Sequence, residues 1–152
     1  MREIKFRAWS PLAREMYKVN SLHFDKEGLS EIVVEVFEVD GVIYSSAVAR
    51  NLELMQFTGL KDKNGKDIYE GDIVIHRYPA GESLYRVEIG ENEHYVNSLA
   101  YSYMGVHFVC IQSDIGHAGE VISGMGYWAL LDELEIIGTI YENPESMKDQ
   151  PT

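Results

Sequence analysis

The sequence predicts a mainly β protein, and three observations support this fold class. Residues 2–9 and 29–39 alternate apolar and polar side chains with a period of two, as half-buried strands do. Turn-forming pairs such as Asp40-Gly41 and Asn64-Gly65 separate the apolar runs. About nine such runs occur along the chain, against two or three short helical patterns. Regular short strands with turns between them favour a barrel or a sandwich.

The first part of the chain is expected to form hairpins. Ser10-Pro11 ends the first strand, and residues 16–19 return as its partner. Residues 29–39 pair with 42–44 across a two-residue turn, because Asp-Gly tolerates the positive φ values that tight hairpins need. Residues 45–51 are a connector whose form the sequence leaves open.

Residues 52–75 give the clearest strand-turn-strand pattern. Successive residues of 52–58 fall on opposite faces of a strand, and Asn64-Gly65 then marks a hairpin turn. Ile68-Tyr69 and 73–75 supply β-branched and aromatic residues on either side of a second turn. The pattern identifies architecture and contains no catalytic signature.

Five residues of this stretch form a structural motif: Asn64, Gly65, Tyr69, Gly71 and Asp72. Gly71 suits a turn that needs unusual backbone angles. Asp72 follows it, and its carboxylate is expected to accept hydrogen bonds from turn amides, as Asp side chains in turns often do. This structural role accounts for Asp72 without any catalysis.

The second part of the chain mixes clear and ambiguous patterns. Strands are expected over 84–89, 106–112 and 134–141. Between them we expect a polar turn at 91–93, a short helix or a loop over 93–104, and a glycine-rich loop over 116–126. Short helices are expected near 127–134, from the apolar spacing, and over 145–148, after Asn143-Pro144.

The chain length of 152 residues fits one domain, 1–152, which is long enough to bury a core without metals or disulfides. No apolar run reaches the length of a membrane-spanning helix, and the N-terminus alternates like a strand where a signal peptide would be apolar. We therefore expect a cytoplasmic protein.

Cys110 is the single cysteine and lies in an apolar run, so we expect a buried thiol.

The net charge of −12 is unevenly distributed. Residues 1–20 carry five basic and two acidic side chains, for +3, so the rest of the chain carries −15. Proteins that bind nucleic acid need a basic face to neutralise phosphates. Only the N-terminal strand offers one, and the acidic remainder argues against ordinary nucleic-acid binding.

Two patterns superficially resemble metal sites. Residues 62–67 resemble a calcium loop, but glycine stands at position 4, whereas an EF-hand loop needs it at position 6. Asp114, His117 and Glu120 have ligand chemistry, but their spacing of three in a glycine-rich segment does not bring three ligands together. No Ser-His-Asp or Cys-His arrangement can be argued from residue order alone, because triads are recognised by their geometry. We predict no metal, no cofactor and no enzymatic activity.

Aromatic residues give the strongest hint of a contact surface. The chain has 17 of them, ten being tyrosine. The cluster in the second half comprises Tyr95, Tyr101, Tyr103, Tyr127 and Trp128. Tyrosine-rich surfaces suit recognition because they contact widely at low cost in conformational entropy. The alternative is that these residues line the core and its helical lid.

Three segments carry a family resemblance: MREIKFRAW at residues 1–9, ELMQFTGLKDKNGKDIYEGDIV at 53–74 and ELEIIGTIYENPE at 133–145. Together they resemble the YopX-like proteins of bacteriophages and prophages. The resemblance implies a phage or prophage protein in a bacterial cytoplasm, a mainly β fold with an SH3-like barrel element, and self-association. It implies no activity, cofactor or catalytic residue.

The sequence departs from this family pattern in two places. Residues 77–126 have no counterpart and are taken as a variable, partly loop-like insertion within the domain. Residue 10 is serine, where an acidic residue commonly follows the tryptophan. Any function carried by the insertion therefore cannot be inherited from the resemblance.

Two functional hypotheses follow. The first is a non-enzymatic, self-associating module that contacts a host or phage protein. The second is a role connected with nucleic acids. In one form the acidic surface imitates DNA and occupies a host DNA-binding protein; in the other the basic N-terminal strand, with Arg2, Lys5 and Arg7, binds a single strand weakly.

Overall fold

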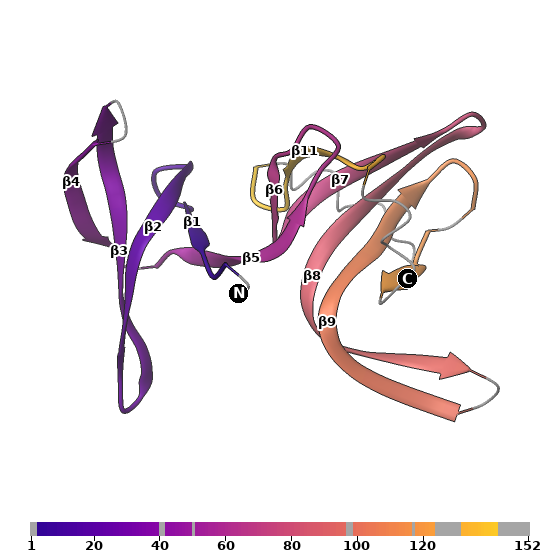
Figure 1. Cartoon of the computed structure of the whole chain (residues 1–152), viewed down its shortest axis with the longest axis horizontal. Coiled ribbons are helices and arrows are strands. Elements are labelled where there is room, and N and C mark those ends of the chain that lie inside the picture. The colour runs from indigo at the N-terminus through magenta and orange to yellow at the C-terminus, as the bar shows by residue number, and fades with distance from the viewer. Residues whose placement is uncertain are drawn as a thin grey trace. The chain divides into compact units, whose positions relative to one another are not determined.

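A computed structural model describes residues 3–39, 42–49, 51–96, 99–116, 118–123 and 132–142 (Figure 1). The chain divides into two compact units, Met1–Phe57 and Thr58–Thr152. The described residues form strands and turns and contain no helix. The predicted mainly β fold class is therefore confirmed. Among the same residues, no segment is a helix long and apolar enough to cross a bilayer.

The first unit is built from successive antiparallel hairpins. Its strands are β1 (Phe6–Ser10), β2 (Glu15–Asp25), β3 (Gly28–Val39), β4 (Val42–Ala49) and β5 (Glu53–Lys61), the last of which continues into the second unit. The sheet order is β4-β3-β2-β1-β5-β6, where β6 is the short strand Asp67–Tyr69. Both predicted hairpins, β1–β2 and β3–β4, are present. The connector after residue 44 is strand as far as Ala49.

Each face of this sheet buries apolar side chains. On one face, Ala8, Ile32 and Val34 are buried, with Leu22 and Leu54 packed beside them. On the other face, buried side chains come from β1 and β5: Trp9, Met55 and Phe57. The alternation of neighbouring positions in β1 and β5 between the two faces is the period-two pattern of the sequence.

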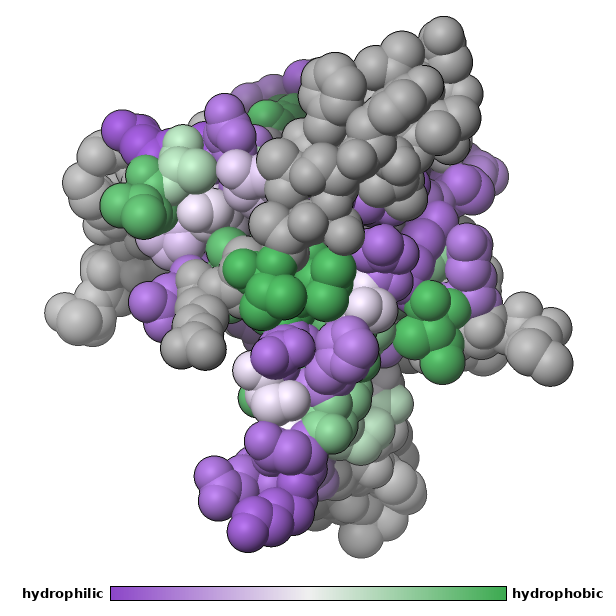
Figure 2. Space-filling model, turned by 90° about the vertical axis from the view of Figure 1, so that its left-hand side faces the viewer, coloured by the Kyte–Doolittle hydropathy of each residue, from purple (hydrophilic) through white to green (hydrophobic). Residues whose placement is uncertain are grey.

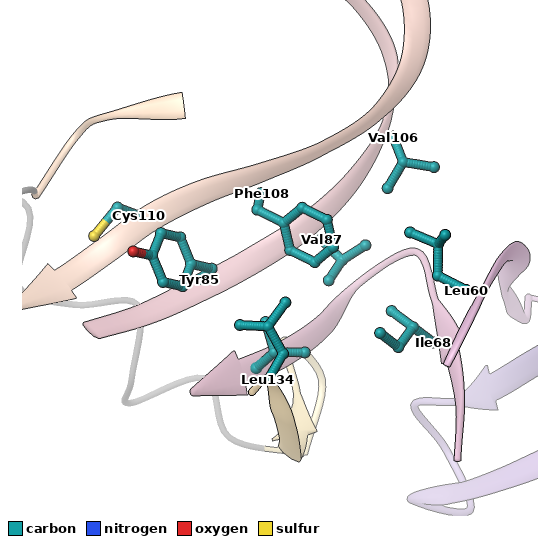
Figure 3. Close-up of a cluster of buried hydrophobic side chains, with 9 residues drawn as sticks. Leu60, Ile68, Tyr85, Val87, Val106, Phe108, Cys110 and Leu134 are labelled. Atoms are coloured by element: carbon teal, nitrogen blue, oxygen red, sulfur yellow. The ribbon is translucent and has the colours of Figure 1, made fainter. Parts of the chain in front are cut away.

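The second unit holds the five-stranded sheet β10-β9-β8-β7-β11. The strands of this sheet are β7 (Asp72–Tyr78), β8 (Gly81–Val96), β9 (Leu99–Ser113), β10 (Val121–Ser123) and β11 (Glu135–Thr139). The short strand β6 also lies in the second unit, but it pairs in the first sheet. The core lies on one face of this sheet and includes Tyr85, Val87, Phe108 and Leu134 (Figure 3). The predicted burial of Cys110 in this core is confirmed.

Several predictions for the second half are wrong. Residues 91–93 are not a turn, and the described part of 93–104 is neither helix nor loop, because β8 and β9 run through both. These positions are rich in polar residues and glycine and lack a clear hydrophobic period. The local sequence therefore does not reveal that they pair in the long β8–β9 ladder. The short strand β10 also lies within the predicted glycine-rich loop.

The predicted SH3-like barrel is not observed among the described strands. The strand order of each sheet runs from one edge to another, with β4 and β6 at the edges of the first sheet and β10 and β11 at those of the second. Of the helix predicted near 127–134, only residues 132–134 are described, and they are not helical: 132–133 form a turn and 134 is irregular. The remainder of that segment, and the helix predicted over 145–148, lie outside the described residues.

Candidate functional site

The loop 62–66 is organised around one buried carboxylate, that of Asp62. Its Oδ1 accepts hydrogen bonds from the N–H groups of Asn64 and Lys66, each at 2.9 Å, and its Oδ2 accepts one from Ile136 N–H at 3.2 Å. Burial raises the pKa of Asp62, but these donors outweigh it and hold the pKa below its ordinary value of 3.8. Asp62 thus fastens the loop to β11.

The second turn of the motif is fixed in a similar way. Asp72 is fully buried, and its Oδ2 accepts a hydrogen bond from Tyr69 N–H at 2.8 Å, which is the kind of turn amide that the sequence suggests. Gly71 has a φ of 78°. Its N–H donates to Val87 O at 2.8 Å, and its carbonyl accepts from Ile140 N–H at 2.9 Å. The turn is therefore hydrogen-bonded to β8 on one side and to the residue that follows β11 on the other.

The tight turn at Asn64-Gly65 uses only the glycine for its unusual backbone angle. Gly65 has a φ of 79°, and Asn64 is not among the residues with positive φ. Gly65 N–H donates to Asp62 O at 2.9 Å. All five motif residues consequently lie in turns or at strand ends.

A set of ion pairs joins this loop to the neighbouring strands. Glu135 Oε2 lies 2.6 Å from Lys63 Nζ and 2.6 Å from Arg77 Nη1. These two cations hold the pKa of the Glu135 carboxyl below its ordinary value. The group is at the surface, where such pairs contribute little to stability.

A row of polar side chains lies at one end of the core face of the second unit. His76 is 2% exposed, and its Nε2 lies 2.5 Å from Glu133 Oε2. His76 Nδ1 is buried without a hydrogen-bond partner among the described residues. The ring packs against Tyr78 at a centroid distance of 4.0 Å. The Tyr78 and Tyr85 hydroxyls are 3.0 Å apart, and burial, followed by the bond to Tyr78, raises the pKa of Tyr85.

This row has the residue types of a hydrolytic triad but not its geometry. Ser83 lies opposite His76 in the β7–β8 ladder, yet its Oγ bonds to Ser113 Oγ at 2.8 Å and the residue is completely buried. A nucleophile must be reachable by substrate and bonded to its base. Sequence reasoning missed this row because His76 and Glu133 are 57 positions apart with no local motif between them.

The thiol of Cys110 is also unsuited to catalysis. Its Sγ donates to Gln112 O at 3.4 Å, and burial raises its pKa. A reactive thiol needs partial exposure and a lowered pKa.

Among the described residues, no group of three His, Cys, Asp or Glu side chains is placed to hold a metal ion. Of the possible metal ligands Asp114, His117 and Glu120, His117 lies outside the described residues.

Three of the five residues of the predicted tyrosine surface lie on one two-stranded extension of the second sheet. β7 pairs with β8 only as far as Arg86, and β10 pairs with β9 only over His107–Val109. Among the strands that the structure describes, only β8 and β9 continue beyond the Gly90–Gly105 pair (Figure 1). We call residues 90–96 and 99–105 the arm. Within the ladder of the arm, three predicted residues pair as Tyr95 with Ala100, Tyr101 with His94, and Tyr103 with Asn92.

The base of the arm is fastened by a buried histidine. His107 is 1% exposed, and its Nε2 lies 2.8 Å from the carbonyl oxygen of Gly90. Near this base, Met104 is 73% exposed and lies opposite Glu91. The remaining predicted contact residues, Tyr127 and Trp128, lie outside the described residues.

Two of the three basic side chains of the N-terminal strand, those of Lys5 and Arg7, have partners within the first unit, and Arg2 lies outside the described residues. Lys5 Nζ lies 4.2 Å from the centre of the Phe57 ring, and Arg7 Nε donates to Met55 Sδ at 3.2 Å. Because these cations are already engaged, the strand is a poorer phosphate-binding face than its charge alone indicates.

Comparison with protein families matches residues 5–148 to the YopX protein family. The chain belongs to the YopX family. The recognition of this family from three sequence segments is therefore confirmed, and the matched range includes the stretch 77–126. A comparison with curated proteins gave no match.

Two solved structures resemble this YopX-family chain over almost its whole length. The protein EF1440 from Enterococcus faecalis is 25% identical, with a TM-score of 0.53, and covers 97% of this chain and 100% of its own. YopX from Bacillus subtilis is 19% identical, with a TM-score of 0.52 and the same coverage. The second likeness shows the fold alone.

The two units of this YopX-family protein differ sharply in charge. Residues 1–57 have seven basic and nine acidic side chains, for a net charge of −2. Residues 58–152 have six basic and sixteen acidic side chains, for −10. The stretch 87–147 contains no lysine or arginine. The acidic character that the composition indicates therefore belongs almost entirely to the second unit.

Proposed function

We propose that this protein is a non-enzymatic, self-associating protein-interaction module of phage or prophage origin that acts in the bacterial cytoplasm. The observation that carries the proposal is the arm. It extends a two-stranded ladder past every other described strand of its sheet. Two-stranded ribbons are marginally stable in water on their own. An element of this kind is best explained as a surface that another protein covers.

The composition of the arm supports recognition of a protein. Tyr95, Tyr101 and Tyr103 lie in its ladder, and tyrosine supplies large contact area with few rotatable bonds. Met104 is strongly exposed, and flexible methionine side chains adapt to irregular partner surfaces. The buried, mutually bonded hydroxyls of Ser83 and Ser113 and the buried thiol support a structural role for the chemically suggestive residues.

The proposal is tested by shortening the arm. Replacing residues 91–104 with Asn-Gly closes the ladder at the Gly90–Gly105 pair with a turn that suits a two-residue hairpin. Tagged wild-type and shortened proteins are purified from nuclease-treated bacterial lysate, and bound proteins are identified by mass spectrometry. We expect one specific protein to accompany the wild type and to be lost with the arm, while the melting temperature stays within a few degrees. Equal recovery by both proteins would count against the arm as the contact surface.

The charge difference between the units favours one form of a nucleic-acid-related alternative. A surface that imitates DNA must be strongly acidic, and the second unit carries −10. The engaged side chains of Lys5 and Arg7 weigh against single-strand binding. The two forms are separated by a mobility-shift assay with single-stranded DNA and by competition with DNA for a basic DNA-binding protein. A shift of single-stranded DNA that weakens with salt would instead support the basic strand.

A further inference from the structure

We infer that β4 pairs with β4 of a second copy of the chain, antiparallel and about a two-fold axis. This inference rests on the proposed self-association and names its surface. Among the described strands, β4 is at the edge of its sheet and pairs only with β3. Its outer side therefore presents a row of backbone N–H and C=O groups that no described strand pairs with.

The sequence of β4 lacks the usual protection of an edge strand. Val42–Ala49 reads VIYSSAVA and contains no charged residue and no proline. Natural edge strands are commonly blocked by lysine, proline or bulges. Register shifts occur around Phe37, but the ladder is regular from Ile32–Ala49 to Glu35–Ser46. The half of β4 from Ser46 to Ala49 is therefore the better template for another strand.

Apolar surface accompanies this edge. Val48 is 54% exposed, and its cross-strand neighbour Val33 is half-buried. The first unit also exposes apolar side chains elsewhere: Ile4, Leu12, Phe24 and Leu29. On the face drawn in Figure 2, apolar side chains form separate patches among hydrophilic ones. Covering Val48 on two copies would bury apolar area in addition to forming ladder hydrogen bonds.

Charge selects a second copy as the occupant. An antiparallel pair of identical strands is self-complementary, and an uncharged strand brings no like charges face to face. The first unit carries −2, whereas the second carries −10 and would repel its own copy. A strongly charged partner would gain nothing from an uncharged strand. Pairing through β4 would join two six-stranded sheets into one continuous sheet.

The test is the molar mass of the full chain, measured by sedimentation velocity over a wide concentration range. Val48→Lys places a cation at the edge and a like cation on the partner. We expect it to weaken the dimer by roughly tenfold or more. Val48→Thr keeps a β-branched residue and should leave the dimer intact. Leu12→Lys is the matched control, because Leu12 is 97% exposed in the turn before β2.

The outcomes separate this inference from the proposal beneath it. Circular dichroism melting establishes that each variant is folded. A wild-type dimer lost only in Val48→Lys supports β4 pairing. A folded Val48→Lys variant as dimeric as the wild type would overturn β4 pairing and leave self-association standing. A wild type that is monomeric at every concentration would overturn both.

Discussion

Individual residues in this fold mostly position backbone, and Gly81 at the β7–β8 turn shows how little freedom some of them have. Gly81 has a φ of 151°, and a Cβ added there would lie 2.7 Å from Asp114 Cβ. We predict that Gly81→Ala lowers the free energy of unfolding by roughly 1–3 kcal/mol. Gly90→Ala is the control, because an added Cβ there meets nothing within 4 Å. Urea denaturation of both variants measures the difference, and equal stabilities would contradict the strain argument.

Asp62 predicts how stability responds to acid. Its pKa is lowered in the folded protein, so the carboxylate stabilises the fold above the unfolded-state value of 3.8. That contribution is lost as the pH falls through 3.8 and on through the lower folded-state pKa. Asp62→Asn removes the titrating group but keeps one acceptor oxygen. We expect the stability difference between wild type and variant to shrink on acidification, as measured by denaturation at several pH values.

A constant difference between wild type and Asp62→Asn across that pH range would contradict the prediction. Glu70→Gln is a suitable control, because the Glu70 carboxylate makes no hydrogen bond or ion pair with the described residues. Like Asp62→Asn, this substitution removes one negative charge, but it leaves the hydrogen bond from Ile136 N–H to Asp62 in place.

At the level of elements, local pattern predicts hairpins well and long ladders poorly. The strands around Asn64-Gly65 were predictable because alternation and turn residues agree. The arm was not, since residues 90–105 mix glycine, charge and tyrosine, and their ladder is stabilised by pairing between strands. The polar row at His76 was equally hidden, because it joins residues that only the folded sheet brings together.

The arm should therefore be the least stable part of the second sheet. Its ladder has two strands, whereas residues 83–86 of β8 lie between β7 and β9. We predict that backbone amides of residues 91–104 exchange hydrogen for deuterium well before those of 83–86, because local opening of the arm exposes fewer buried contacts. Hydrogen-exchange mass spectrometry checks this in the free protein. Equal protection of both segments would indicate that the arm is already covered.

For the whole molecule, the uneven charge predicts how self-association depends on salt. Each copy carries −12, so two copies repel at any distance within the Debye length. Association through the uncharged β4 strand gains nothing from opposite charges and works against this repulsion. Added salt screens the repulsion, and we therefore expect the dimer to become tighter as sodium chloride is raised from low to physiological concentration.

The sign of this salt effect distinguishes two kinds of interface. Contacts between opposite charges weaken with salt, since screening removes their attraction. If the acidic second unit of one copy instead bound the N-terminal cations of another, the dimer would loosen as salt increased. Sedimentation velocity at several salt concentrations decides between them, and Val48→Lys at each concentration shows whether the salt-dependent species is the β4 dimer. Loosening with salt would reject the uncharged edge as the main contact.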